Sequence, residues 1–453
     1  MNKKVRLIYR DPRFRLAAKF TLIFLFFLSL SWQRLDPDFG WHLTSGDYYR
    51  HHGIPSHDIY TYTASNFPWI NHEWGNDVLL SIFYSIGGYF LISMIYAGLW
   101  TAALFVRAAK TRWFLLVLAS LAVIPYAGIR PVAWTFLFFA ILLNLLESKK
   151  RIPYISICVL FILWANLHAG FIVGLASIAF YLIKTRDIKF AKIFGVAAVS
   201  TLVNPYGPRL YEEVARTLFD SKLHSQIVEW SSLWIFNVSF PFIALWIAGF
   251  ILYKRRPLGN WFNLGPLLLA SSLAATRNLP LFVIATVKET NDFYDKFRRS
   301  MPKLNLAAKS VLTSSLAILV LALFYVSYPA FLFWHNRYSA YPDQAVSYLN
   351  NHPCHGNLFN DYNYGGYLIW KLPNTPLYID GRMSPWRDPT GTKYLTTYLN
   401  LLKNNNLRES QFNKYGIKCV LIKSSNKRFV EDLKSDNWNV VNEGNGAVLL
   451  KQG

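Results

Sequence analysis

Long apolar runs alternate with short polar segments over residues 1–334, and this pattern ends after that point. A run of about 20 apolar residues with few charges is typical of a helix that crosses a lipid bilayer. The sequence therefore predicts a polytopic α-helical membrane domain with about eleven spans. The predicted spans cover residues 16–34, 88–106, 113–128, 132–146, 153–166, 170–183, 190–203, a run that ends at 254, 260–275, a short and broken segment that returns near 288, and 308–334.

Two polar stretches between these runs are long enough to form outer loops. The first covers residues 35–77 and leads into a helix at about 75–86 that we expect to lie at the membrane interface. The second begins at residue 204 and ends near 238. No small-residue cleavage site follows the first apolar run, so we interpret it as a retained span and not as a signal peptide.

Clusters of lysine and arginine set the expected orientation in the cell membrane. Such clusters gather on the cytoplasmic side of bilayers. With the N-terminus inside, all strong clusters fall on the cytoplasmic side and the residues after 334 lie outside. This placement depends on the broken segment near 288, because losing that span would reverse the side of the C-terminal domain. The clusters lie at residues 3–6, 107–112, 149–151, 184–189, 254–256 and 296–299.

The last part of the chain, residues 335–453, has the pattern of a small soluble α/β domain. Apolar runs shorten to strand length and alternate with polar helices. The predicted strands are 357–360, 377–380, 418–423, 438–441 and 447–451, and the predicted helices are 341–351, 392–404 and 427–435. A further helix begins within the stretch N-D-Y-N-Y-G-G-Y-L-I-W, where Asp361 is suited to cap it and Gly365-Gly366 would allow close packing.

Composition supports the membrane interpretation. Only 16% of residues are charged, against about one quarter in a typical soluble domain. The net charge of +22 would suit a nucleic-acid partner, but the clustering between apolar runs explains it without one. Of the three cysteines, Cys158 lies in an apolar run. Cys354 and Cys419 lie in the predicted outer domain, where a disulfide is possible, although two separate buried thiols are the favoured interpretation.

The first outer loop carries the most chemistry. Asp36 and Asp38 directly follow the first span, where carboxylates are costly unless they bind a cation or take part in a reaction. With His42 they could share a proton or bind a divalent metal ion. His72 and Glu73 form a second pair of this kind later in the loop. A solvated loop with local caps explains the same residue types, and the tryptophans at 41, 69 and 74 are also typical of interfacial anchors.

These motifs resemble those of the GT-C superfamily of membrane glycosyltransferases, which use lipid-phosphate sugar donors. The likeness is to protein O-mannosyltransferases and aminoarabinose transferases, and more narrowly to one bacterial membrane-protein family placed in this superfamily. It implies a GT-C-like fold, with Asp38 at the catalytic carboxylate and Glu73 at the glutamate of a later loop motif. The matching stretches are D-P-D-F-G-W-H-L, P-W-I-N-H-E-W, R-P-V-A-W, W-A-N-L-H-A-G, N-P-Y-G, N-D-Y-N-Y-G-G-Y-L-I-W and Y-I-D-G-R.

Two positions depart from the superfamily pattern. Phe39 replaces the usual second acidic residue, so Asp36 is a substitute from the other side. Trp74 replaces a lysine of the later motif, which removes one candidate phosphate contact. Both changes leave open the donor class and the use of a metal ion. If a metal ion is bound, Asp36, Asp38 and Glu73 are the candidate ligands.

The resemblance implies an inverting glycosyltransferase that moves a sugar from a polyprenyl-phosphate donor to an extracytoplasmic acceptor. Such a transfer needs a base near the acceptor hydroxyl and cations near the leaving phosphate. Asp38 is the first candidate base and Asp36 the second. The substrate-binding candidates are His42, His72, Glu73, Arg130, His168 and Arg277.

Several assignments keep a plainer alternative. Snorkelling or helix capping explains Arg130 and Arg277, and His168 is balanced between the two interpretations. Glu229-Trp230 in the second outer loop is a weaker candidate for the same cavity, and Asp380-Gly381-Arg382 either belongs to an acceptor-binding surface or forms a simple turn. A transporter or flippase for a lipid-linked solute and a non-catalytic envelope assembly protein are the rival functions. A transporter would be expected to carry ionisable residues near the middle of its spans.

Overall fold

The computed structural model describes residues 11–33, 35–148, 151–220, 227, 246–248, 250–251, 262–300 and 341–453. By its internal contacts the chain divides into two compact units. The first, here called the helical unit, consists of residues 1–34, 89–207 and 224–335, and the second, here called the mixed unit, of residues 35–88, 208–223 and 336–453. The predicted span at 308–334, most of the run that ends at 254, and Glu229-Trp230 lie outside the described residues.

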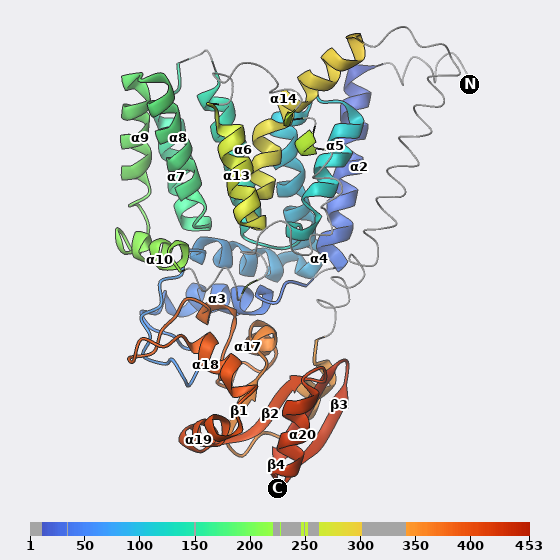
Figure 1. Ribbon diagram of the computed structural model, residues 1–453, viewed down its shortest axis with the longest axis vertical. Helices are drawn as coiled ribbons and strands as arrows, with labels where there is room; N and C mark the ends of the chain where they lie inside the picture. The colour runs from blue at the N-terminus through green and yellow to red at the C-terminus, as the bar shows by residue number, and fades with distance from the viewer. Residues whose placement is uncertain are drawn as a thin grey trace, which may run out of the picture. The chain divides into compact units, whose positions relative to one another are not determined.

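Apolar helices build the helical unit (Figure 1). Helices α7, α8 and α9 pack together, α6 contacts α7 and α8, and α14 packs against α5, α6 and α13. Two described helices, α2 and α4, are long and apolar enough to cross a membrane, judged by length and composition. The bounds are α2 Pro12–Gln33, α4 Trp74–Ala108, α5 Trp113–Ala122, α6 Val132–Leu146, α7 Tyr154–Leu167, α8 Phe171–Thr185, α9 Ile188–Ser200, α13 Leu264–Ala274 and α14 Leu279–Ser300.

Helix α4 contains a sharp break that matches the sequence prediction of two separate elements. Gly87 has φ −142° and Gly88 has φ +58°, both outside helical geometry. The positive φ at Gly88 is a conformation that residues with a side chain rarely adopt. The segment before the break corresponds to the helix expected at 75–86, and the segment after it corresponds to the span expected at 88–106.

Helix α14 differs from the short, broken segment predicted there. It continues for 22 residues, past Lys288, as one helix. Pro280 does not break it because it lies in the first turn, where a missing N–H costs little.

Ion pairs join the ends of α4 and α6 to the middle of α14 in the helical unit. The Arg107 Nη2 lies 2.8 Å from Glu147 Oε1, and Lys288 Nζ lies 3.0 Å from Glu147 Oε2. Arg107 Nε also donates to the Ile284 carbonyl at 2.9 Å. The predicted topology places Arg107, Glu147 and Lys288 on one side of the membrane, and the structure brings them together. The identity of that side as cytoplasmic stays a prediction.

A four-stranded sheet forms the core of the mixed unit. The strand order is β1-β2-β4-β3, with β1 parallel to β2 and the other two pairs antiparallel. The register places Leu358 opposite Cys419 and Val420 opposite Leu450. The bounds are β1 Asn357–Asn360, β2 Ile417–Lys423, β3 Trp438–Gly444 and β4 Ala447–Gln452.

Helices from both ends of the chain surround this sheet. Helix α16 packs against β3 and β4, α20 against β3, α19 against β2, and α17 against α3 from the first outer loop. The bounds are α3 Phe39–His52, α10 Arg209–Leu218, α16 Asp343–Asn351, α17 Gly365–Lys371, α18 Tyr394–Leu401, α19 Asn405–Tyr415 and α20 Lys427–Ser435. The predicted helix at 427–435 is present with the same bounds, and those at 341–351 and 392–404 are present but shorter.

The strand predicted at 377–380 is wrong. Leu377 forms only isolated bridges, to Thr61 and to Leu358. The backbone of this segment is bonded instead by the Asn360 side chain, which donates to the Ile379 carbonyl at 2.8 Å and accepts from Tyr378 N at 3.0 Å. A side-chain amide therefore takes the place of part of a strand ladder.

The favoured interpretation of two separate thiols is also wrong, because Cys354 and Cys419 form a disulfide. Cys419 lies on β2, and Cys354 lies in the turn that leads into β1, the neighbouring strand. Parallel pairing of β1 with β2 brings the start of both strands to the same edge. The sequence did not reveal this pairing of strands.

Candidate active site

The acidic motif of the first outer loop forms the start of helix α3. The Asp36 Oδ1 accepts a hydrogen bond from the Asp38 backbone N at 3.0 Å, and the Asp36 carbonyl accepts from Phe39 N at 3.0 Å. Asp38 is the N-cap residue, but its side chain makes no capping hydrogen bond. The Asp36 carboxylate therefore shapes the turn, whereas the Asp38 carboxylate has a different role from the usual cap.

The Asp38 carboxylate lies directly against the backbone of Gly381. A Cβ atom built on Gly381 would lie 2.0 Å from Asp38 Oδ1, which is too close for any side chain. The Gly381 carbonyl accepts hydrogen bonds from the hydroxyls of Tyr362 at 3.2 Å and Ser384 at 2.8 Å. The D-G-R stretch of the C-terminal domain thus forms one wall beside the candidate catalytic carboxylate.

A second close approach joins α3 to α17. A Cβ on Gly40 would lie 2.1 Å from the Gly366 carbonyl oxygen, and one on Gly366 would lie 2.2 Å from the Pro37 carbonyl oxygen. Two glycines at the crossing let the backbones approach more closely than side chains would permit. The glycine pair that was expected to allow close packing therefore positions the acidic motif.

Behind Asp38, one turn along α3, His42 lies in a buried acidic cluster. Its Nδ1 is 2.6 Å from Asp77 Oδ1, and its Nε2 is 3.7 Å from Glu73 Oε2. The Asn71 amide donates to Asp77 Oδ2 at 2.7 Å, so both oxygens of Asp77 are engaged. His42 is 4% exposed and Asp77 is fully buried. His42 therefore lies near Glu73 of the second pair, and Asp77 is its closer partner.

This environment keeps His42 charged. Burial lowers the pKa of His42, but the adjacent Asp77 carboxylate, its hydrogen bond, and the charges of Glu73 and Asp38 outweigh burial and raise that pKa to about 9. At neutral pH the ring is therefore an imidazolium that donates from both nitrogens. His72, in contrast, is partly exposed and reaches Glu73 Oε1 at 3.7 Å.

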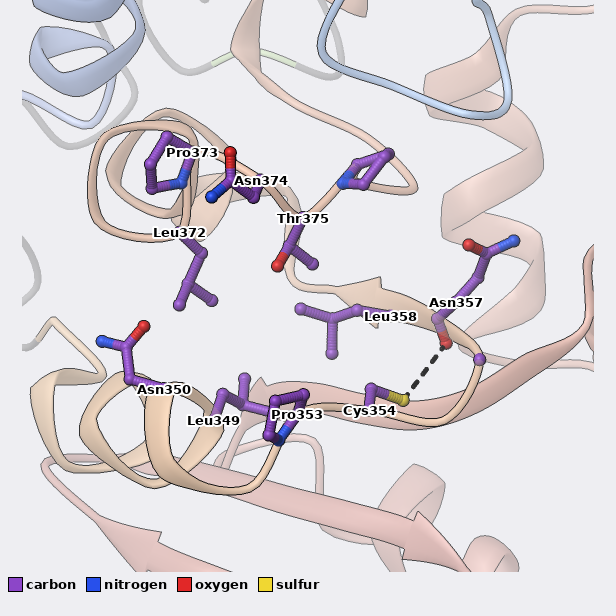
Figure 2. A pocket seen from close by; sticks show the side chains of 12 residues that line it. Leu349, Asn350, Pro353, Cys354, Asn357, Leu358, Leu372, Pro373, Asn374 and Thr375 are labelled. Carbon is purple, nitrogen blue, oxygen red and sulfur yellow. Dashed lines mark hydrogen bonds between the residues drawn. The ribbon is translucent and has the colours of Figure 1, made fainter.

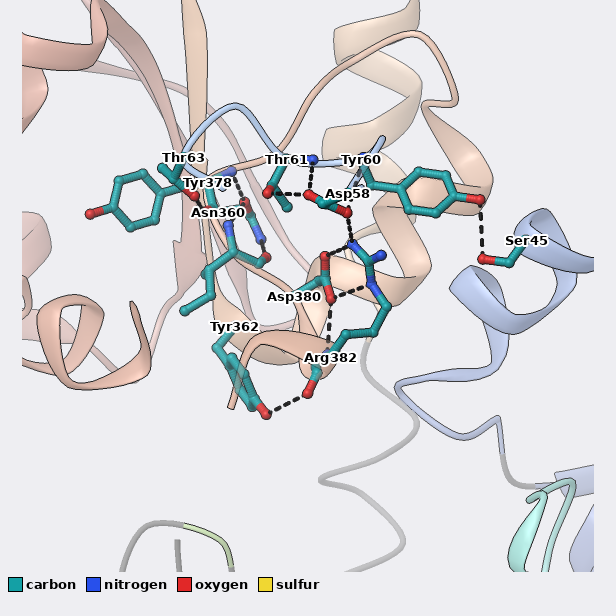
Figure 3. A network of polar contacts seen from close by, with 12 residues as sticks. Ser45, Asp58, Tyr60, Thr61, Thr63, Asn360, Tyr362, Tyr378, Asp380 and Arg382 are labelled. Atoms are coloured by element: carbon teal, nitrogen blue, oxygen red, sulfur yellow. Dashed lines mark hydrogen bonds and ion pairs between the residues drawn. The ribbon is translucent and has the colours of Figure 1, made fainter. Parts of the chain in front are cut away.

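A buried arginine joins the outer loop to the C-terminal domain (Figure 3). The Arg382 Nη2 lies 2.6 Å from Asp380 Oδ2 and 2.8 Å from Asp58 Oδ1, and its Nε donates to Asp380 Oδ1 at 2.9 Å. Asp58 also accepts from Thr61 N at 2.9 Å. The guanidinium lies near the rings of Trp69, Tyr60, Trp386 and Trp41, at 4.4, 4.8, 5.3 and 5.9 Å from their centroids.

The electrostatics of this arginine are balanced within the protein. Burial alone would lower the pKa of Arg382, but the Asp380 and Asp58 carboxylates reverse that effect and raise it. Because two carboxylates surround one guanidinium, Arg382 is neutralised locally. Arg382 thus links Asp58 to Asp380, although these two residues lie more than three hundred positions apart in the chain.

Part of the second outer loop joins the mixed unit through a further ion pair. Lys393 Nζ lies 2.5 Å from Asp220 Oδ2, and both side chains are buried. Helix α10 precedes Asp220, and its Arg216 lies over the ring of Phe67 at 5.4 Å.

Arg130, His168 and Arg277 lie at helix ends of the helical unit, as expected. Arg130 precedes α6, His168 follows α7, and Arg277 lies in the short turn between α13 and α14. The Nδ1 of His168 accepts from Gly170 N at 2.9 Å and is 2.8 Å from the Thr135 hydroxyl. Since Nδ1 is an acceptor, the ring carries its proton on Nε2, and His168 would offer a phosphate a neutral donor and not a positive charge.

The three carboxylates proposed as metal ligands differ in their surroundings. Asp36 accepts a backbone N–H within its turn, and Glu73 faces His42 and His72. Among the described residues, no group of three or more histidine, cysteine, aspartate or glutamate side chains is placed to hold a metal ion. Asp36, Asp38 and Glu73 do not fit a metal site in this arrangement. A divalent ion stays a prediction, and no step below passes through one.

Sequence reasoning missed two residues of this region. Asp77 was treated as the end of the loop, yet it follows Glu73 by one helical turn, a spacing that places both carboxylates on one face. Arg382 was noted as part of either an acceptor-binding surface or a turn, and not as a buried ion-pair partner. Its burial could not be read from the chain, because Asp58 and Asp380 surround it only after the loop and the domain have packed together.

The comparisons with known proteins place this fold. Neither a family model nor a curated protein sequence matches the chain. Among solved structures, an oligosaccharyltransferase from Archaeoglobus fulgidus tethered with an acceptor peptide matches with TM-score 0.56 and 12% identity. The match covers 90% of this chain and 69% of that one.

Two further structures give similar matches. ArnT from Cupriavidus metallidurans, bound to undecaprenyl phosphate, gives a TM-score of 0.53 at 12% identity over 96% of this chain and 97% of that one. The arabinofuranosyltransferase AftD from Mycobacteria gives a TM-score of 0.53 at 12% identity, over 97% of this chain and 40% of that one. The chain thus has the fold of the GT-C membrane glycosyltransferases, which confirms the fold that its motifs implied.

Proposed function

We propose that the chain is an inverting membrane glycosyltransferase. In this reaction a sugar passes from a polyprenyl-phosphate donor to a hydroxyl of an acceptor outside the cytoplasm, with the N-terminus inside and the mixed unit outside. The observation that carries the proposal is the position of the Asp38 carboxylate, at the start of α3 and against Gly381. The GT-C fold supports the same reaction class.

Asp38 acts as the general base in the proposed mechanism. The acceptor oxygen attacks the anomeric carbon from the face opposite the phosphate and loses its proton to the Asp38 carboxylate. The bond between the anomeric carbon and the phosphate oxygen breaks, and the leaving polyprenyl phosphate keeps the electron pair. A base of this kind contributes about a hundredfold to ten-thousandfold to the rate.

The remaining candidate residues take supporting roles. The His42 imidazolium holds the acidic cluster together, and Glu73 is part of that cluster with His72 at its edge. We assign Arg130 and Arg277 to the leaving phosphate, with His168 as a neutral hydrogen-bond donor. Cations and donors placed where negative charge develops stabilise the transition state.

Lipid mass spectrometry and an Asp38 variant test the proposal. The protein is purified in membrane nanodiscs, and any co-purifying polyprenyl-linked sugar then serves as the donor in a transfer assay. We expect Asp38→Asn to lower kcat by about a hundredfold or more. Asp47→Asn is the matched control, because Asp47 lies on the same helix with its side chain 64% exposed.

Three outcomes separate the rival functions. Full transfer activity in the Asp38→Asn, Asp36→Asn double variant would refute the assignment of the base. A bound lipid carrier that crosses the bilayer without transfer would favour a flippase. Absence of any lipid carrier and of any transfer would favour an assembly protein.

A further inference from the structure

A pocket in the mixed unit lies beyond the residues proposed for transfer. It has a volume of about 430 Å³ and is formed by the end of α16, the turn before β1, the start of β1 and the segment that follows α17. Figure 2 shows its lining side chains. The volume lies within the range of about 300–1,000 Å³ that is typical of small-molecule sites.

The pocket lies at the opposite end of β1 from Asp380 and Gly381, which lie beside the Asp38 carboxylate. Asn357 and Leu358 at the start of the strand line it, whereas Asn360 at the other end bonds Ile379 beside Asp380. Its contents would therefore be bound apart from the Asp38 carboxylate.

The lining carries no charge, in a chain whose net charge is +22. Two lysines beside the lining already donate hydrogen bonds to other groups of the protein. Lys451 Nζ donates to the carbonyls of His352 and Pro353 at 2.8 and 3.3 Å, and Lys418 Nζ donates to Gln452 Oε1 at 2.6 Å. An anionic ligand would therefore find no free cation in the lining to pair with. An uncharged ligand could bind here without leaving a charged side chain of the lining unpaired.

An apolar floor and a polar rim divide the pocket. The side chains of Leu349, Leu358 and Leu372 are buried and face the central space in Figure 2. The amides of Asn350 and Asn374 lie at the sides, and Thr375 carries its hydroxyl between them and the strand. Among the described residues, neither of these two amide side chains has a hydrogen-bond partner.

The polar groups at the rim are suited to hydrogen-bonding a ligand through side chains, and they are poorly suited to binding a peptide backbone. Three prolines line the pocket, and proline has no N–H to donate. The edge of β1 is covered beside it, because Leu358 bridges to Leu377, so a peptide cannot add as a further strand. Side-chain amides both donate and accept hydrogen bonds, as do hydroxyl groups.

We propose that this pocket binds an uncharged, hydroxyl-rich ligand of the kind that one or two residues of a neutral glycan present. The C–H faces of the sugar rings lie on the leucine floor, and the hydroxyls bond to the Asn350 and Asn374 amides. The inference concerns binding alone, so it goes beyond the proposed transfer reaction and does not depend on it.

Saturation-transfer NMR on the full chain tests this binding. The protein is placed in phospholipid nanodiscs without sugar-based detergents, which would occupy the site. The probes are the neutral disaccharides maltose, lactose and chitobiose, and a glucuronate-containing disaccharide is the anionic comparison. We expect saturation transfer to at least one neutral probe and at least tenfold weaker binding of the anionic one.

Variants of the rim locate the bound sugar. Asn350→Ala with Asn374→Ala removes two neutral hydrogen bonds, and we expect about tenfold weaker binding. Asn351→Ala is the matched control, since Asn351 is an exposed neighbour on α16 that does not line the pocket. Thr375→Trp fills the pocket and should abolish binding, whereas Asp38→Asn should leave it unchanged.

Each contrary result overturns the proposal. Absence of saturation transfer from every neutral probe at millimolar concentration would show that the pocket does not bind glycans. Equal binding by the double alanine variant and by the unmodified chain would place the sugar elsewhere. Equal binding of the anionic probe would refute the argument from charge.

Discussion

Replacing Arg382 by methionine should strongly destabilise the mixed unit. The side chain is 3% exposed, and it lies within 2.8 Å of one carboxylate and 2.6 Å of another. Methionine keeps much of the apolar contact with the surrounding rings but leaves Asp58 and Asp380 buried without a cation. Breaking a buried ion pair from one side costs about 3–5 kcal/mol in free energy of unfolding.

Hydrogen exchange measured by mass spectrometry on nanodisc-embedded protein reports this loss locally. We expect faster exchange of the amides near Asp58 and in the segment that contains Asp380, by a factor that matches about 3 kcal/mol or more. Arg387→Met is the matched control, because Arg387 is half-exposed and reaches Asp220 only at 3.9 Å. An exposed pair of that kind contributes about 0–1 kcal/mol.

A third variant decides whether charge is the cause. Arg382→Met combined with Asp58→Asn and Asp380→Asn removes all three charges, so most of the lost stability should return. If the single variant lost less than about 1 kcal/mol, or if the triple variant were no more stable than the single one, the reasoning from uncompensated burial would be refuted.

Three further predictions follow from the same unit. Gly381→Ala should displace the Asp38 carboxylate and lower kcat. The Gly381→Ala, Asp38→Asn double variant should be no slower than Asp38→Asn alone. Additive losses in kcat would contradict a role of Gly381 exerted through Asp38. His42 has a raised pKa, so its stabilising contribution is complete below pH 6.5 and is lost as pH rises to about 9, by about 1.4 kcal/mol per unit. A thermal-unfolding series should show this decline in the unmodified chain but not in His42→Asn. Cys354→Ser with Cys419→Ser should lower the unfolding free energy of the domain by about 4 kcal/mol, given a separation of 65 residues, and unchanged denaturant unfolding would argue against the pair.

Local sequence patterns predicted the elements but not how they pair. The short apolar runs at β1 and β2 were enough to locate both strands, because a buried strand leaves that signature in its own residues. The pairing of β1 with β2, and hence the disulfide, depends on contacts between distant segments. Nothing in the local pattern of either cysteine distinguishes a bridge from two buried thiols.

Helix α19 shows a different limit. It was not predicted, because few of its residues are apolar. Its buried residues are Phe412 and Arg408. Its ends carried the available signal. Asn404 caps the start by accepting from Leu407 N at 3.0 Å, and Gly416 ends the helix with φ +60°. An asparagine and a glycine at this separation would have indicated a helix where periodicity did not.

The candidate site was predictable only where its residues are close in the sequence. Asp38, His42 and Glu73 lie in one loop, and their grouping could be anticipated from sequence proximity. Gly381 and Arg382 could not, because the first loop and the last segment of the chain become neighbours only in the folded mixed unit. Because Gly381 and Arg382 are far from Asp38 in the sequence, their position beside the candidate base could not be predicted.

The surrounding contacts show which acidic residues of this unit are already engaged by a buried cation. The oxygens of a carboxylate that is bonded to a buried cation are already engaged and are not available to an acceptor hydroxyl. Asp77 is bonded to the His42 imidazolium, and Asp58 and Asp380 are bonded to the Arg382 guanidinium. Asp36 accepts from a backbone N–H in its own turn. Asp38 begins the same helix with its carboxylate against Gly381, so its choice as the base rests on this position together with the resemblance.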